Sequence, residues 1–147
     1  MKKLFIAAIA IVALATTAVA ADGGKNVNYW VLSKFNNSYK AATNVNWVVT
    51  SQYAKATFLL DGERVEAYYS TEGEFIAESK AIATQDLPRM ARKTIEKKYS
   101  GYTLKEVIEY ATPEKTEYYV SMENEKESKI LKISSGGEIE VFKTLQK

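Results

Sequence analysis

YAKATFLLDGERVEAYYS, residues 53–70, is the stretch that decides the fold. Asp61 and Gly62 at its centre favour a two-residue hairpin turn, because both residue types tolerate the positive φ angles that such a turn needs. Leu60 then lies opposite Glu63, and counting outward fixes the other cross-strand pairs. One face of this hairpin is polar and aromatic, and the other is apolar: Ala54, Ala56, Phe58, Val65, Ala67 and Tyr69. We therefore expect an antiparallel strand pair with one buried face.

Strands are predicted on both sides of this hairpin. The turn Thr71-Glu72-Gly73 suits a three-residue loop with glycine in the left-handed conformation, and leads into a strand over 74–80. Ala67 is expected opposite Ala77, because a slip of one residue would place Glu78 on the apolar face. Before the hairpin, residues 44–49 are rich in β-branched and aromatic side chains, which is typical of a strand.

Two segments have helical spacing of apolar residues. The first, about 29–41, carries Val31, Phe35 and Tyr39 on one stripe. The second follows Asp86-Leu87-Pro88, where Asp86 is a candidate N-cap, and ends before Gly101. Its basic side chains are better explained as a solvated helix surface than as a docking patch for an acidic partner.

The second half of the chain repeats the pattern of the first. Strands are expected over 102–110, 117–124, 127–133 and 138–143, and a shift of 64 residues carries the inner-face positions onto seven apolar residues out of eight. The same shift carries Gly73 onto Gly137. We predict an α+β fold of two tandem helix-plus-four-strand repeats, about 29–80 and 84–143, which form an antiparallel sheet with the helices packed on one face and share one core.

The N-terminus has the pattern of a cleavable secretory signal peptide. Lys2 and Lys3 precede an apolar run, and Ala18-Val19-Ala20 offers a small-x-small cleavage site before Ala21. We expect a signal peptide at 1–20, a mature domain at 21–147, and a periplasmic or secreted location. A membrane anchor is the less favoured alternative, because the apolar run is shorter than the ~20 residues of a membrane span. Stable membrane insertion after cleavage is not expected.

Charge and residue usage exclude several function classes. Without the two leader lysines, 18 basic and 18 acidic residues remain, a balance that argues against nucleic-acid binding. The chain has no cysteine and no histidine, which removes disulfides, Ser-His and Cys-His nucleophiles, and the usual zinc or haem ligands. Surface glutamates such as Glu63 and Glu72 are better explained by solubility than by catalysis. We expect no enzyme activity, no cofactor and no metal, and interpret the acidic stretch 123–127 as a solvated hairpin tip rather than a Ca²⁺ site.

The polar face of the predicted sheet is the best candidate for function. It interleaves aromatic and charged side chains, a composition typical of protein recognition surfaces. The alternative is that aromatic cross-strand pairs only stabilise an exposed sheet. The candidate protein-binding residues are Tyr53, Lys55, Arg64, Glu66, Tyr68, Tyr119, Lys132 and Phe142.

An ordered series of short motifs resembles a known family. The motifs are Asn44-Val45-Asn46-Trp47, Tyr53-Ala54-Lys55-Ala56-Thr57-Phe58, residues 67–73, Leu87-Pro88 and residues 97–102. Together they span nearly all of the predicted mature domain and resemble the β-lactamase-inhibitor-like, PepSY-like family of exported bacterial proteins. The resemblance implies a tandem α+β fold with helices on one face of an antiparallel sheet. Lys40 stands where the family pattern would have proline, so the chain departs from that pattern at the end of the first helix.

The resemblance also bears on function. PepSY domains are associated with restraining peptidases, whereas the namesake inhibitor is disulfide-bonded and this chain has no cysteine, so inhibition of β-lactamase itself is not implied. We predict a non-catalytic exported binding module that restrains an envelope peptidase or another hydrolase through its open sheet face. The partner would be an unknown envelope or secreted protein. The alternative is a small-ligand carrier or envelope sensor with a pocket between the sheet and the helices near Trp47.

Overall fold

The structure is a computed structural model, and it describes residues 26–147. The predicted signal peptide and its cleavage site lie outside the described residues. The elements, in chain order, are α2 (Tyr29–Ser38), β1 (Thr43–Val49), β2 (Tyr53–Leu60), β3 (Glu63–Ser70), β4 (Phe75–Ala81), the short 3₁₀ helix η2 (Thr84–Asp86), α3 (Arg89–Lys98), β5 (Thr103–Ala111), β6 (Thr116–Glu123), β7 (Glu127–Ser134) and β8 (Ile139–Gln146).

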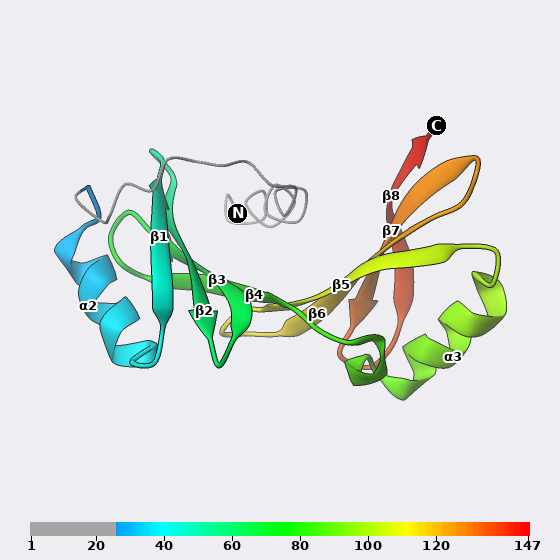
Figure 1. The fold of residues 1–147 in the computed structure, drawn as a ribbon, viewed down its shortest axis with the longest axis horizontal. Helices are drawn as coiled ribbons and strands as arrows, with labels where there is room; N and C mark the ends of the chain where they lie inside the picture. Colours follow the sequence, from blue (N-terminus) through cyan, green and yellow to red (C-terminus); the bar gives the residue numbers. More distant parts are fainter. Residues whose placement is uncertain (1–25) are drawn as a thin grey trace.

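All eight strands belong to one antiparallel sheet whose order in space is the order in the chain. Figure 1 shows α2 beside β1 at one end of the molecule and α3 at the other end, with β4 and β5 crossing the centre between them. The two central strands pair directly, from Glu78 opposite Ala111 to Ala81 opposite Ile108. This pairing joins the first four strands to the last four without a break in the ladder.

The predicted fold class is therefore wrong in its architecture. We expected two tandem helix-plus-four-strand repeats around a shared core, and the structure is instead one continuous eight-stranded sheet, mostly strand, with two α-helices in the described residues. The helices do not share a core either, because each packs on its own apolar cluster. The spacing of apolar residues predicted many of the buried side chains, although Val141, expected on the inner face, is 51% exposed. It held no information on whether the strands of the two halves would pair with each other.

The two clusters lie on the same face of the sheet, which we call the helix face. Val31 and Phe35 of α2 pack on Trp47 and Phe58, and the ring centroids of Phe35 and Phe58 lie 5.0 Å apart. Ala91 and Ile95 of α3 pack on another cluster, whose sheet residues are Val107, Val120, Met122, Leu131 and Ile133. Full burial of an apolar side chain of this size contributes about 1.5–3 kcal/mol, so these contacts hold the helices on the sheet.

The register of the β2–β3 hairpin is confirmed. Leu60 pairs with Glu63 and Phe58 pairs with Val65, so the apolar face lies as expected. Asp61 has a φ of 53° and Gly62 a φ of 84°, the two positive angles that this turn requires.

The expected register of β4 is wrong by one residue. Tyr69 pairs with Phe75, but a bulge follows, and Ala67 pairs with Glu78 instead of Ala77. Glu78 therefore lies on the helix face, where the Tyr39 hydroxyl donates a 2.5 Å hydrogen bond to its Oε2. This bond supplies the polar partner that a carboxylate needs beside an apolar cluster.

The end of α2 and the start of α3 differ from expectation. Asn28 caps α2, since its side chain accepts a 2.8 Å hydrogen bond from the Trp30 backbone N–H, and the helix ends at Ser38 rather than near residue 41. Asp86, the expected N-cap of α3, lies instead in η2, where its carboxylate accepts from the Ala83 backbone N–H at 3.3 Å. Pro88 occupies the cap position of α3 and provides no side-chain bond.

Two turn glycines lie against the first turns of the helices. A Cβ atom at Gly73 would come within 2.9 Å of the Trp30 Cβ, and one at Gly137 within 3.0 Å of the Met90 Cβ. Gly73 has a φ of +93° and Gly137 a φ of +89°. Any other residue at either turn would be strained, and its Cβ would press against the first turn of the helix.

Gly137→Ala is therefore expected to destabilise the fold by about 1–3 kcal/mol. The neighbouring Gly136→Ala should have little effect, because its Cβ would meet only the Ser134 Oγ, at an ordinary 3.7 Å. Urea unfolding followed by circular dichroism measures both changes in the free energy of unfolding. Equal effects of the two substitutions would show that the close contact with α3 has no energetic consequence.

Candidate functional site

The face of the sheet opposite the helices carries a cluster of aromatic rings, and we call it the tyrosine face. Tyr68, Ala77, Tyr110 and Tyr119 form its buried centre, with Tyr53 packed at the side. The bulge in β4 turns Ala77 toward this face, directly opposite Tyr68. A small side chain at that position leaves room for the larger rings on the neighbouring strands. The result is a band of tyrosines across the middle strands of the sheet.

Ring contacts extend this band toward both edges. The centroids of Tyr53 and Tyr68 lie 5.9 Å apart, and those of Tyr110 and Tyr119 lie 6.3 Å apart. Phe142 on β8 continues the row, with its centroid 5.5 Å from that of Tyr119 in an edge-to-face arrangement. Side chains held by such contacts have little freedom left to lose on binding.

A buried carboxylate sits beside the tyrosines. Glu66 is only 1% exposed, and its Oε1 accepts a 3.1 Å hydrogen bond from Arg64 Nη2 while its Oε2 accepts a 2.7 Å bond from the Tyr68 hydroxyl. The Lys55 ammonium lies 3.6 Å from Oε1. Two cations and one hydroxyl thus offset the desolvation of this single carboxylate.

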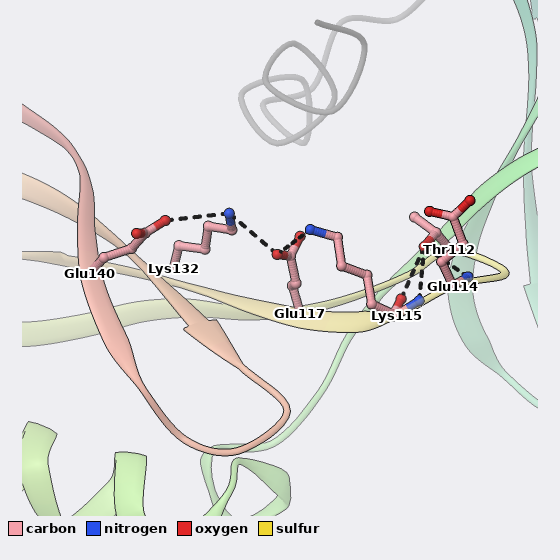
Figure 2. A network of polar contacts seen from close by, with 6 residues as sticks. All are labelled: Thr112, Glu114, Lys115, Glu117, Lys132 and Glu140. Atoms are coloured by element: carbon pink, nitrogen blue, oxygen red, sulfur yellow. Dashed lines mark hydrogen bonds and ion pairs between the residues drawn. The ribbon is translucent and has the colours of Figure 1, made fainter. Parts of the chain in front are cut away.

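A second charged network lies on the same face near β6 and β7. Figure 2 shows Glu117 between Lys115 and Lys132, with Lys132 reaching on to Glu140. The distances from Glu117 Oε1 are 2.7 Å to Lys115 Nζ and 3.3 Å to Lys132 Nζ. Burial opposes ionisation of Glu117, but the hydrogen bonds from the two lysines outweigh it and lower the pKa of the carboxyl.

The structure places all of the candidate binding residues on the tyrosine face, in two groups. Tyr53, Lys55, Arg64 and Tyr68 surround Glu66, while Tyr119, Lys132 and Phe142 lie toward β8. Not all of these side chains project from the sheet as anchors for a partner, because their exposed fractions differ widely.

Tyr68 and Tyr119 are only 2% and 4% exposed, so their rings form a floor and not projecting anchors. Phe142 is 37% exposed, and the Arg64 side chain is 49% exposed. A partner would therefore reach Arg64 and Phe142 first. The binding role of the whole set stays a prediction.

Sequence reasoning missed two residues of this face. Tyr110 belongs to the buried centre, and Glu117 organises the second network. Alternation along β5 was the available signal for Tyr110, because Val107 faces α3 and residues an odd number of positions away must face the other side. Glu117 lies two positions before Tyr119, so alternation placed it on this face, but its two lysine partners come from a turn and from another strand and could not be foreseen.

The space expected near Trp47 is filled. The Trp47 ring is 6% exposed and lies 5.1 Å from the centroid of Phe35 and 6.3 Å from that of Tyr69. This packing counts against a ligand pocket between the sheet and α2. A small hollow of about 240 Å³ lies elsewhere, on the tyrosine face, and is lined by Glu117, Lys132, Ser134, Glu138, Ile139 and Glu140.

Residues 26–147 contain neither a candidate metal site nor a candidate membrane span. No group of three or more acidic side chains in that range is placed to hold a metal ion. No helix in the same range is long and apolar enough to cross a membrane.

Comparison with known proteins places the fold. No family model matches the sequence, and no curated protein matches it. Among solved structures, a DUF2874 family protein from Bacteroides ovatus has a TM-score of 0.72 at 16% identity, over 84% of this chain and 89% of that one. A protein from Bacteroides eggerthii described as periplasmic has a TM-score of 0.71 at 14% identity, over 82% and 88%.

A BLIP-like protein from Bacteroides fragilis is similar as well. Its TM-score is 0.67 at 20% sequence identity, and the match covers 81% of this chain and 85% of that one. The fold of this chain is therefore BLIP-like and shared with DUF2874 family proteins. At these identities the likeness concerns the fold alone.

The Glu66 cluster predicts measurable coupling between neighbours. Tyr68→Phe removes one donor and should cost about 1 kcal/mol of stability. Glu66→Gln leaves Lys55 without its counter-charge and should cost about 2 kcal/mol, less than for a fully enclosed pair because Arg64 can turn to solvent. The double variant should lose less stability than the sum of the two single losses, by about 0.5 kcal/mol or more, as measured by urea unfolding. Strict additivity would show that the hydroxyl and the carboxylate do not interact.

Buried tyrosines predict an alkaline loss of stability. Burial, and after it the charge of Glu117, raise the pKa of Tyr119 from the ordinary 10.0 to about 12. In the unfolded chain this tyrosine loses its proton near its ordinary pKa, so the native state binds more protons than the unfolded state between pH 10 and about 12. Stability should be unaffected below that window and should fall as pH rises through it.

Ultraviolet absorbance of tyrosinate measures this titration. Wild-type protein should show a late step in this titration, and Tyr119→Phe should reduce the amplitude of that step, because burial raises the pKa of Tyr119 to about 12. A late step of unchanged amplitude in Tyr119→Phe would contradict the assignment.

Proposed function

We propose that this chain is a non-catalytic exported binding module that engages an envelope protein through its tyrosine face. The partner we propose is a hydrolase, such as an envelope peptidase, which the module restrains. The observation that carries the proposal is the pre-organised cluster of Tyr68, Tyr110 and Tyr119, with exposed Arg64 and Phe142 beside it. Aromatic and arginine side chains on a rigid support are the usual energetic centres of protein interfaces.

The charged groups of this face support binding rather than catalysis. General acid–base work by paired carboxylates needs one of them free to exchange a proton with substrate. Glu66 is held by Lys55 and Arg64, and Glu117 by Lys115 and Lys132. Both carboxylates are thus committed to cations within the fold, and the chain has no histidine or cysteine to take over the chemistry.

The comparisons add support for the compartment and the partner class. One structural neighbour is described as periplasmic, and another as BLIP-like, which favours a hydrolase as the partner. The predicted signal peptide leads to the same compartment. The alternative function, a small-ligand carrier, has no comparable support, because the space near Trp47 is occupied by packed rings.

Affinity capture tests this proposal. Purified protein used as bait in an envelope extract of the source organism should retain a hydrolase, identified by mass spectrometry. The double change Arg64→Ala and Phe142→Ala should reduce capture by about tenfold or more, the effect of losing roughly 1.4 kcal/mol or more of binding free energy.

A matched control uses exposed side chains on the helix side. Met90 and Trp30 are both 64% exposed and pack at the starts of α3 and α2. Changing both to alanine should leave capture unchanged. If the Met90 and Trp30 changes abolish capture while the Arg64 and Phe142 changes leave it intact, the binding surface does not lie on the tyrosine face.

A further inference from the structure

The outer edge of β8 is an exposed strand with apolar side chains. Among the described residues, β8 pairs only with β7, and it ends the sheet near the C-terminus (Figure 1). Val141 and Leu145 are each 51% exposed, and Phe142 is 37% exposed. An exposed strand edge offers a row of backbone donors and acceptors to another strand, and natural proteins usually block such an edge.

The opposite edge, β1, is blocked in several ways. Its pairing with β2 is irregular between Thr43 and Asn46, which leaves regular pairs only from Asn46 to Val49. Asn44 has a φ of 52°, outside the extended region, and its carbonyl accepts a 3.2 Å hydrogen bond from the Asn46 side chain. The β1 edge therefore offers a poor template, and head-to-tail growth through β1 and β8 is disfavoured.

Charge along β8 and its flanks is divided between its two ends. Glu138 and Glu140 lie at the beginning, and Lys143 and Lys147 lie at the end. All four residues are exposed. When this segment runs antiparallel to a copy of itself, the acidic end of each copy lies beside the basic end of the other. Parallel pairing would instead bring like charges together.

We propose that β8 is a self-association edge, at which two copies of this chain pair their β8 strands antiparallel about a two-fold axis. The occupant of the edge is thus a second copy of the chain, selected by charge complementarity. A two-fold axis perpendicular to the sheet keeps both tyrosine faces on the same side. The dimer presents two partner-binding faces in one continuous surface.

The charges also exclude one of the neighbouring registers. With Phe142 opposite Phe142, Lys143 lies opposite Val141 and Glu140 opposite Thr144, so no like charges face each other. Moving the centre one residue toward the C-terminus would place Lys143 opposite Lys143, which is unfavourable. The pairing of β8 with β7 is irregular between Ile130 and Leu131, which leaves Phe142 without a partner on β7 and divides the β8 edge into two short regular stretches. Association should therefore be reversible and dependent on concentration.

Charge-reversal variants test the pairing. Glu138→Lys with Glu140→Lys makes every charged side chain in residues 138–147 basic. Lys143→Glu with Lys147→Glu makes every one of them acidic. Wild-type protein should shift toward twice the monomer mass as concentration rises in sedimentation velocity, and each variant alone should lose that shift. An equimolar mixture of the two variants should regain it, because opposite charges again meet at the edge.

Reversing the charges should leave the fold intact. Glu140 is 68% exposed in its side chain and Lys147 43%, so the intramolecular ion pairs that they form contribute little to stability. Circular dichroism of each variant checks this. Val49→Lys on the β1 edge is the matched control, since Val49 is 44% exposed, and it should still dimerise.

Disulfide trapping tests the register independently. The chain has no cysteine, so Phe142→Cys introduces a single thiol. Under mild oxidation it should form a covalent dimer, whereas Val49→Cys should stay monomeric. A wild-type protein that remains monomeric throughout the concentration series, a mixture that fails to recover the dimer, or preferential cross-linking of Val49→Cys would each overturn the proposal.

Discussion

One extra residue at the start of β4 determines what lies on each face at the centre of the sheet. Tyr69 pairs with Phe75 and Tyr68 with Ala77, so Ile76 is inserted between two pairs. Side chains alternate between faces along a strand, and an inserted residue exchanges the faces of everything after it. Ala77 thereby joins Tyr68 on the tyrosine face, and Glu78 moves to the helix face. The tyrosine band and the Tyr39–Glu78 hydrogen bond both depend on this insertion.

The pairing of β4 with β5 then determines how the two apolar clusters are related. They are connected through the sheet, and between them the helix face carries the ion pair Lys80–Glu109, with a separation of 3.5 Å. No helix packs over that centre in the described part of the chain, so charged side chains can stay hydrated there. The two helices are held independently, and local opening of one need not disturb the other.

The sequence predicted those parts of the fold that depend on local chemistry. Asp61-Gly62 fixed the first hairpin, and Gly137 marked the turn before β8. The β4 bulge could not be predicted, because Ile76 and Ala77 are both apolar and suit either face. The Tyr39 hydroxyl that stabilises Glu78 follows the end of α2 and is 39 residues away in the chain. The candidate site was predicted in part for the same reason. Counting along strands placed Tyr68 and Tyr119 on the correct face, but their burial depends on side chains from neighbouring strands, which the local sequence does not show.

The two faces of the sheet also differ in how far packing dictates their residues. Most positions 64 apart on the helix face are both apolar, as at Phe58 and Met122, because a helix packs over each cluster, and Val65 with Lys129 is an exception. On the tyrosine face the corresponding positions differ in charge: Tyr53 and Glu117, Lys55 and Tyr119, Glu66 and Ile130, Tyr68 and Lys132. The two α-helices of the described residues pack on the other face, so packing against a helix does not require these positions to be apolar. Their chemistry is set by contacts within the face itself, where Glu66 and Glu117 each gather two cations from different strands and turns. A partner would therefore meet two differently charged ends separated by a common floor of tyrosine, and such asymmetry fixes one orientation of binding.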